Sequence, residues 1–232
     1  MTRWIASVVC WLTLSMAQAD DGSKGVSEFS SERIKHLVTP LGEGRFQIGN
    51  VTFHKAKREV SFPTKVNLRD VLIEYAVVGQ KGKLHEALLS TEVSPSHVHI
   101  AMLLLGPKDL PLPSTRRRGP KGQPIDVLLK WRQGEQWKQV RLEDWIRLEN
   151  SQVPIPHGIW VYNGARITNG YFTANTDQSI VAIILDRDAL VNNPRAGNEN
   201  DEIWFPNEAA IPPLGTPVTV TLRLIDDDDV SP

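Results

Sequence analysis

The chain is nearly free of cysteine, and this scarcity removes several classes of chemistry. Its single cysteine, Cys10, lies in an apolar N-terminal segment that has the features of a cleaved signal. Once that segment is removed, no thiol remains. Disulfide bonds, thiolate catalysis, cysteine-rich zinc sites and iron–sulfur clusters are then excluded together.

The sequence also lacks a long apolar run and a strong net charge. A membrane-spanning helix needs about 20 consecutive apolar residues, and no segment after the N-terminus reaches that length. The formal net charge of the whole chain is -1, which gives no global attraction to nucleic acid or to anionic membranes. We therefore expect no transmembrane segment and no nucleic-acid partner, and instead an unknown protein or small-molecule ligand.

The N-terminus predicts export. Arg3 supplies the positive start, residues 4–16 form an apolar stretch too short to span a membrane, and Ala17-Gln18-Ala19 is a small-x-small cleavage site. We expect residues 1–19 to be a signal peptide and the mature protein to begin at Asp20. The protein would then be periplasmic or secreted.

The rest of the chain reads as one domain with two polar ends. Residues 20–44 begin with a polar, serine-rich stretch and are expected to form a flexible lead-in. Residues 45–225 form the predicted single β-rich domain. Residues 226–232 are an acidic tail, which we interpret as solvated because it lacks the spaced ligands of a calcium loop.

Most of the predicted domain consists of short strands. Apolar and polar residues alternate in many runs bounded by turn residues, a pattern typical of half-buried strands. The runs are residues 51–55, 59–62, 73–78, 85–90, 125–131, 137–142, 159–162, 180–185 and 218–224. Glycines at both ends of residues 79–82 predict a hairpin between the third and fourth runs.

One long helix is predicted, over residues 95–105. Ser94 suits the N-cap, Pro95 suits the first helical position, and Gly106 followed by Pro107 is a stop signal. The helix has no fully polar face, so it should be buried nearly all round. Short helical turns are expected at residues 143–146 and 188–191.

These elements predict a mainly β fold of the α+β class, with a sandwich-like or partly closed sheet around the buried helix. Two half-domains divided at residues 106–124 are the alternative. That segment is a long Pro/Gly-rich loop, and it carries a cluster of cations. The cations, Arg116, Arg117, Arg118 and Lys121, would form either an anion- or partner-binding loop or a solvated, protease-sensitive one.

The main candidate site lies at residues 83–106, where three of the six histidines stand beside the most apolar segment of the mature chain. An H-E-x-x-H zinc motif begins at His85 but fails, because the fifth residue is Leu89. His97 and His99 cannot bind one metal ion from a regular helix, because two residues correspond to about 200° of rotation.

A composite site remains. If the predicted hairpin pairs Gly79 with Gly82, then Glu74 and His85 share one face of the sheet and Glu86 points to the other. A register shift of one residue reverses this grouping. Together with His99 from the helix, Glu74 and His85 have the ligand types of a site for a single divalent metal, zinc or non-haem iron. The same residues could form a buried histidine–carboxylate network without metal. No other cofactor is indicated.

The tryptophans invite a carbohydrate-binding interpretation, but most lie in strand-like or short helical contexts. There, packing in the core is the commoner use of an indole ring. We expect this for Trp131, Trp137, Trp145 and Trp160. Trp204, near the end of the domain, is expected to be exposed.

Several segments together resemble the YdjY-type domain of exported bacterial proteins. They are residues 66–75, 81–89, 97–106, 122–131, 143–145 and 160–164. The resemblance covers roughly residues 45–225. It rests on the order of these segments and not on a catalytic signature.

The family pattern has a Glu, a His-Glu pair and a helical His, and these match Glu74, His85, Glu86 and His99. The resemblance therefore favours His99 over His97 as a site residue. Some relatives carry ferredoxin-type cysteines, but their electron-transfer role is not carried over to a mature chain without cysteine. The resemblance implies no established activity.

Two functions are consistent with the sequence. The first is an exported, soluble binding or accessory protein without catalysis of its own. The alternative is a metal-dependent enzyme with a His/Glu site centred on His85. Convergence of histidine nitrogens and carboxylate oxygens on one point would distinguish the enzyme from the binding protein.

Overall fold

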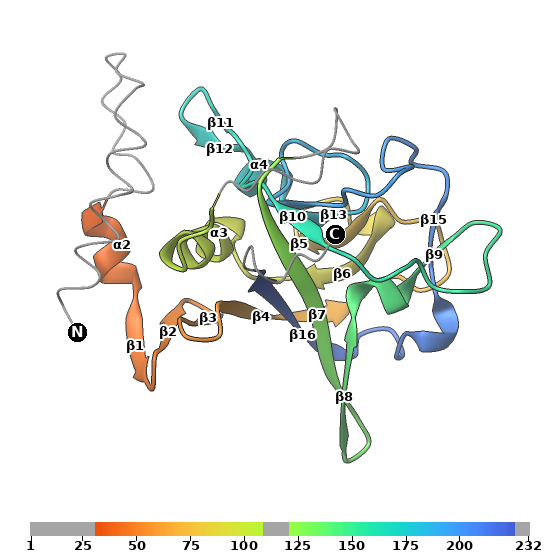
Figure 1. Ribbon diagram of the computed structural model, residues 1–232, viewed down its shortest axis with the longest axis horizontal. Helices are drawn as coiled ribbons and strands as arrows, with labels where there is room; N and C mark the ends of the chain where they lie inside the picture. Colours follow the sequence, from red (N-terminus) through yellow and green to blue (C-terminus); the bar gives the residue numbers. More distant parts are fainter. Residues whose placement is uncertain (1–30, 109–120, 226–232) are drawn as a thin grey trace.

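The computed structural model describes residues 31–108 and 121–225 (Figure 1). Its main sheet closes on itself, because β4 pairs with β16 on one edge and with β6 on the other. Eight strands form the resulting mixed barrel. In barrel order they are β4 (Glu59–Val66), β16 (Pro217–Leu224), β7 (Gln123–Gln133), β10 (Trp160–Tyr162), β14 (Val191–Asn192), β13 (Ser179–Ala182), β5 (Tyr75–Gly79) and β6 (Ala87–Thr91).

The mainly β prediction is confirmed, and the sheet is more completely closed than a sandwich. Two neighbouring pairs, β5–β6 and β13–β14, are parallel, and the other barrel pairs are antiparallel. Strand β7 begins at the end of residues 106–124 and lies between β16 and β10 in the sheet. Since β4 comes before that segment and nearly all of β7 comes after it, one sheet contains both halves of the chain.

Alternation along the strands builds the barrel core. In β4, Val60, Phe62 and Val66 are buried, and in β16 every second residue from Val218 to Leu224 is buried. Full burial of such side chains contributes about 1.5–3 kcal/mol each. The strand pattern read from the sequence therefore marks the inner face of the barrel.

Three further strands extend the sheet beyond β4. They are β1 (Thr39–Gly42), β2 (Arg45–Ile48) and β3 (Val51–His54), in an antiparallel meander preceded by α2 (Ser31–Leu37). The flexible lead-in expected over residues 20–44 is therefore wrong for residues 31–44. Ile34, an apolar residue in a polar stretch, is fully buried in the core, and this burial stabilises the helix.

The predicted hairpin at residues 79–82 is wrong in its pairing. The turn forms, since the Gly82 N–H donates to the Gly79 carbonyl at 3.0 Å. The chain then returns through the short 3-10 helix η1 (Leu84–Glu86), so that β6 enters parallel to β5. Every residue of β6 is buried, as expected for a strand paired on both edges and covered on both faces.

The predicted helix is confirmed as α3 (Pro95–Leu104), which contacts β3, β4 and α4 (Thr173–Asp177) (Figure 1). Ser94 does not cap it through its side chain. Instead, the Oδ1 atom of Asn175 accepts a hydrogen bond from the Ser96 N–H at 3.0 Å. A residue of α4 thus satisfies a free N–H at the start of α3.

The remaining elements lie outside the barrel path. The β7–β8 hairpin projects from the barrel (Figure 1). The turn expected at residues 143–146 forms as a 3-10 helix, whereas the helical turn expected at residues 188–191 does not form: residues 187–190 are a turn and a bend, and β14 begins at Val191. No helix within residues 31–108 and 121–225 has the length and apolarity of a membrane span. The elements are β8 (Gln136–Arg141), η2 (Leu142–Trp145), β9 (Ile146–Leu148), β11 (Ile167–Thr168), β12 (Tyr171–Phe172), β15 (Trp204–Pro206) and η3 (Glu208–Ala210).

Two tryptophan predictions are wrong. Trp204 is buried because β15 pairs with β9 and its indole donates to the Gly197 carbonyl at 3.2 Å. Trp137 is 62 % exposed on the projecting hairpin, where the Lys130 ammonium lies 4.9 Å from its ring centroid. The other three, Trp131, Trp145 and Trp160, are buried as expected.

Candidate functional site

The predicted carboxylates meet at the start of the β5–β6 pair. Glu74 precedes β5, Glu86 precedes β6, and the Glu74 N–H donates to the Glu86 carbonyl at 2.9 Å. Lys83 lies between the two side chains, with Nζ 3.4 Å from Glu74 Oε2 and 3.0 Å from Glu86 Oε1. His85 turns away, because its side chain is 80 % exposed and its Nε2 atom is 3.6 Å from Glu86 Oε2.

Lys83 offsets part of the negative charge of this cluster. Burial and the negative charge of Glu86 raise the pKa of Glu74. Burial alone would lower the pKa of Lys83, but its interactions with Glu86 and Tyr75 outweigh burial, and the pKa is raised. Burial, with help from Asp186, raises the pKa of Tyr75 to about 12. A charged lysine therefore offsets one of the two negative charges that Glu74 and Glu86 carry when both are ionised.

His99 lies in a different, buried environment. Its Nδ1 atom is 2.7 Å from the Tyr162 hydroxyl, and its ring centroid is 4.7 Å from that of Phe172. Burial lowers the pKa of His99 to about 4 and raises that of Tyr162. Near neutral pH the imidazole is therefore neutral and the phenol is protonated, which suits a structural hydrogen bond.

His97 faces another direction, as the helical spacing predicts. It lies against Gly49 in the β2–β3 turn, where an added Cβ would be 2.7 Å from His97 Nδ1. Gly49 also has a φ of +54°, which favours glycine. His97 and His99 thus contact different parts of the fold, and neither faces the other.

Glu74, His85 and His99 do not converge. Glu74 and His85 lie before β6, whereas His99 lies on the helix that follows it. The five residues of β6 span about 16 Å at the usual strand rise. In the part of the chain that the structure describes, no group of three or more His, Cys, Asp or Glu side chains is arranged to hold a metal ion.

The predicted anion-binding loop is largely outside the described residues. Arg116, Arg117 and Arg118 fall within residues 109–120, and Lys121 is exposed at the start of the following segment.

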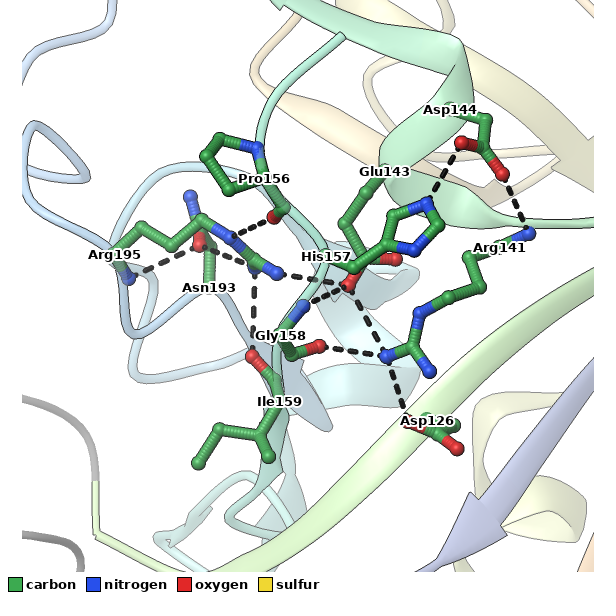
Figure 2. Close-up of polar contacts among 10 residues, drawn as sticks. All are labelled: Asp126, Arg141, Glu143, Asp144, Pro156, His157, Gly158, Ile159, Asn193 and Arg195. Atoms are coloured by element: carbon green, nitrogen blue, oxygen red, sulfur yellow. Dashed lines mark hydrogen bonds and ion pairs between the residues drawn. The ribbon is translucent and has the colours of Figure 1, made fainter. Parts of the chain in front are cut away.

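Sequence reasoning missed a buried ion network around Glu143 in η2 (Figure 2). The Glu143 side chain is fully buried, and its Oε1 atom accepts hydrogen bonds from Arg195 Nη2 at 2.8 Å and from the Gly158 N–H at 3.0 Å. Arg141 Nη2 lies 3.3 Å from the same oxygen and 2.7 Å from Asp126 Oδ1. One carboxylate thus connects η2 to two distant loops.

Arg195, in the loop after β14, is held by several further contacts. Arg195 also donates to the carbonyls of Pro156 and Ile159 and to Asn193 Oδ1, and it lies 5.3 Å from the ring centroid of Trp160. His157, beside this network, is 2.8 Å from Asp144 Oδ1. Because Arg195 and the Nη2 atom of Arg141 both bond to acceptors of the protein itself, we interpret the network as a structural clamp.

The sequence contains only part of the signal for this clamp. Residues 143–145 belong to the family pattern, but they read there as a short helical turn. Arg195 lies among Asn, Pro and Gly residues without periodicity, and no spacing rule connects it to Glu143 over 52 positions.

A groove opens on the barrel where β4 changes its neighbour. Within β4, residues 59–61 pair with β3, whereas Lys65 and Val66 pair with β6. Pro63 and Thr64 lie between the two pairings and line the groove. We call this the seam groove, and it has a volume of about 160 Å³. Its lining residues are Asn50, Pro63, Thr64, Lys65, Gln80, Ser90, Thr91, Glu92 and Val93.

Three hydroxyl groups line the seam groove, and one of them is unsatisfied. Thr64 donates to the Val218 carbonyl at 2.8 Å, and Thr91 donates to the Pro63 carbonyl at 2.6 Å. The Ser90 hydroxyl is buried and has no hydrogen-bond partner among the described residues. A buried hydroxyl without a partner costs about 1–3 kcal/mol, so this atom marks a place where a ligand atom could bind.

The comparisons with known proteins agree with the segments noted in the sequence. A family model, the YdjY domain, matches residues 51–223. The chain belongs to the YdjY domain family. No curated protein and no solved structure matches the chain. The match includes all eight barrel strands up to Arg223 and both strands that flank the seam groove.

Proposed function

We propose that this YdjY domain protein is an exported binding protein and that its ligand occupies the seam groove. The observation that carries the proposal is the buried, unpartnered hydroxyl of Ser90 in the groove wall. Buried polar groups in proteins are nearly always hydrogen-bonded. A ligand that bonds to Ser90 would remove the cost of leaving its hydroxyl unsatisfied.

The size of the groove is consistent with a small ligand. Its volume of about 160 Å³ lies below the ~300–1,000 Å³ of typical drug-sized sites, so only a small ligand would fit. Its walls combine apolar side chains, Pro63 and Val93, with a few polar groups. Such a mixture can bury the body of a ligand and orient it by hydrogen bonds.

A metal-dependent enzyme centred on His85 has less support. His85 is largely exposed, Lys83 already pairs with both Glu74 and Glu86, and His99 bonds to Tyr162. A cation placed at Glu74 would have to compete with the Lys83 ammonium. Binding without catalysis is therefore the preferred proposal.

Thermal denaturation with a defined panel of compounds tests the binding function. The panel contains amino acids and short peptides, mono- and dicarboxylates, monosaccharides and nucleosides. A ligand that binds only the folded protein raises the Tm, so we expect one class to raise the Tm of the wild type. Gln80→Trp, which fills the groove from its exposed rim, should abolish that rise.

Lys81→Trp is the matched control, because Lys81 is in the same turn and does not line the groove. It should respond as the wild type does. The proposal fails if no class raises the Tm, or if Gln80→Trp and Lys81→Trp respond alike.

Export is part of the proposal and has its own test. The support is the positive start at Arg3 and the site Ala17-Gln18-Ala19. Mass spectrometry of the intact protein from a periplasmic or culture fraction should give a chain that begins at Asp20. A full-length chain that begins at Met1 and stays in the cytoplasm would contradict export.

A further inference from the structure

Two opposite charges flank the unsatisfied hydroxyl in the seam groove. Lys65 on β4 is the direct partner of Ser90 on β6 in the strand register. Cross-strand partners project from the same face of a sheet. Glu92 follows Ser90 by two residues, which is the spacing that returns a side chain to the same side of an extended chain. Lys65 and Glu92 both line the groove.

Neither charge is neutralised within the described residues. Lys65 and Glu92 form no ion pair with each other or with another described side chain, and both are exposed. Elsewhere around the barrel, the half-buried acids Glu59, Asp188 and Asp126 each have an arginine partner. The groove thus presents a cation, an unsatisfied hydroxyl and an anion that are not already committed to one another.

We propose that the ligand of the seam groove is a zwitterion, an amino acid or a short peptide with free ends. Its carboxylate would bind Lys65, its ammonium group would bind Glu92, and the Ser90 hydroxyl would bond to a polar atom between them. The inference rests on the proposed binding function and deepens it. It names the chemical class of the ligand for the same site.

Other ligand classes match the groove less well. A phosphate or dicarboxylate would meet one lysine and be repelled by Glu92. A divalent cation would find a single carboxylate among the lining side chains and be repelled by Lys65. A neutral sugar would leave both charges without a partner. Only a ligand with both signs is attracted by both side chains.

Calorimetric titration with glycine, diglycine and triglycine tests the proposal, because the three probes differ only in the separation of their charges. We expect at least one to bind the wild type. N-acetyl and C-terminal amide forms of that probe each lose one charge and should bind about fivefold more weakly, the upper range for an exposed charge pair. Binding should weaken at high salt.

Charge reversal gives the sharper arm of the experiment. Lys65→Glu alone and Glu92→Lys alone should each weaken binding of the zwitterion, because each leaves two like charges in the groove. The double variant restores one charge of each sign, and a zwitterion can bind in the reversed orientation. The double variant should therefore recover most of the wild-type affinity.

Two results would refute the zwitterion as the ligand class while leaving the seam groove as the binding site. In one, none of the three probes binds, although another class raises the Tm of the wild type and not of Gln80→Trp. In the other, one single reversal strengthens binding of the ligand, which indicates a ligand of one sign. If no compound of any class depends on Gln80, the binding function itself fails.

Discussion

Ser90 and His99 are both buried polar residues in the segment that follows Lys83, yet their chemistry differs. His99 has a protein partner, because its Nδ1 atom lies 2.7 Å from the Tyr162 hydroxyl. The Ser90 hydroxyl has no such partner in the described chain. A satisfied buried group holds the fold together, whereas an unsatisfied one lowers stability until a ligand completes it. We therefore assign His99 to structure and Ser90 to binding.

His99 should make stability depend on pH. Burial lowers the pKa of His99 from its ordinary value of 6.5 to about 4 in the folded protein. Between these values the unfolded chain binds the proton more readily, so stability is lost as the pH falls from about 6.5 to about 4. The loss attributable to His99 is about 3 kcal/mol. Urea denaturation at a series of pH values measures it.

His99→Gln should remove this part of the pH dependence, because glutamine does not titrate. His85→Gln, at a side chain that is 80 % exposed, is the matched control for the substitution itself. Equal slopes for wild type and His99→Gln would show that the imidazole is not held neutral by burial.

Two of the three hydroxyls of the groove wall should respond differently to removal. Ser90→Ala removes an unsatisfied hydroxyl and should raise the free energy of unfolding by about 1–3 kcal/mol. Thr64→Val deletes a bond to the Val218 carbonyl and should cost about 1–3 kcal/mol. Urea denaturation of both variants, without added ligand, checks this. A large loss at Ser90 would mean that its hydroxyl has a partner within the protein.

At the scale of elements, α3 was predictable and the β5–β6 pair was not. The helix has local start and stop signals at Pro95 and Gly106 and an apolar run between them. The glycines at 79 and 82 predict a turn, and the turn forms. Whether the next strand then pairs antiparallel or parallel depends on distant contacts with β4 and on burial of Leu84, which no local signal contains.

Leu104 reports on the packing of α3. It is 2 % exposed in the main core, so Leu104→Ala should cost about 2–5 kcal/mol through lost burial and a residual cavity. Leu214 is 63 % exposed, and Leu214→Ala should change stability by no more than about 0.5 kcal/mol. Equal losses at the two leucines in urea denaturation would contradict the placement of the core.

The clamp around Glu143 should be among the more sensitive polar positions of the fold. Glu143→Gln removes the charge that two arginines share and leaves Arg195 buried without its anion. Removing one partner of a buried ion pair costs about 3–5 kcal/mol. Glu149→Gln, at an exposed carboxylate shortly after the same 3-10 helix, should have little effect. Similar stabilities of the two variants, compared by urea denaturation, would contradict the structural role of the clamp.

At the scale of the molecule, the sequence predicts a mainly β protein but not the closure of its sheet. Alternation in β4 and β16 identifies their inner faces without indicating which strands are neighbours. Closure requires β4 to pair with β3 over one part of its length and with β6 over another. That change of neighbour also creates the seam groove. The pairing of strands far apart in the sequence therefore explains why closure of the sheet could not be predicted. The same pairing forms the groove that we propose as the ligand site.

The groove that we propose as the ligand site shares residues 83–106 with the site expected from the sequence, but it uses different side chains. Residues 83–106 attract attention through their histidines, and they do contain Ser90 and Glu92 of the groove. A serine inside an apolar strand and a glutamate at its end carry no spacing signature. Their significance appears only when Lys65, from a strand distant in sequence, becomes the partner of Ser90.

The central claim is that the seam groove is the ligand site of this protein. Two-dimensional ¹H–¹⁵N NMR of the labelled protein, titrated with the compound that most raises its Tm, tests the claim most directly. We predict the largest shift changes at the amides of Thr64, Lys65 and residues 90–93, with little change at Glu74, Glu86 and His99. Changes centred on Glu74 and Glu86, or on His99, with the groove amides unmoved, would contradict the account.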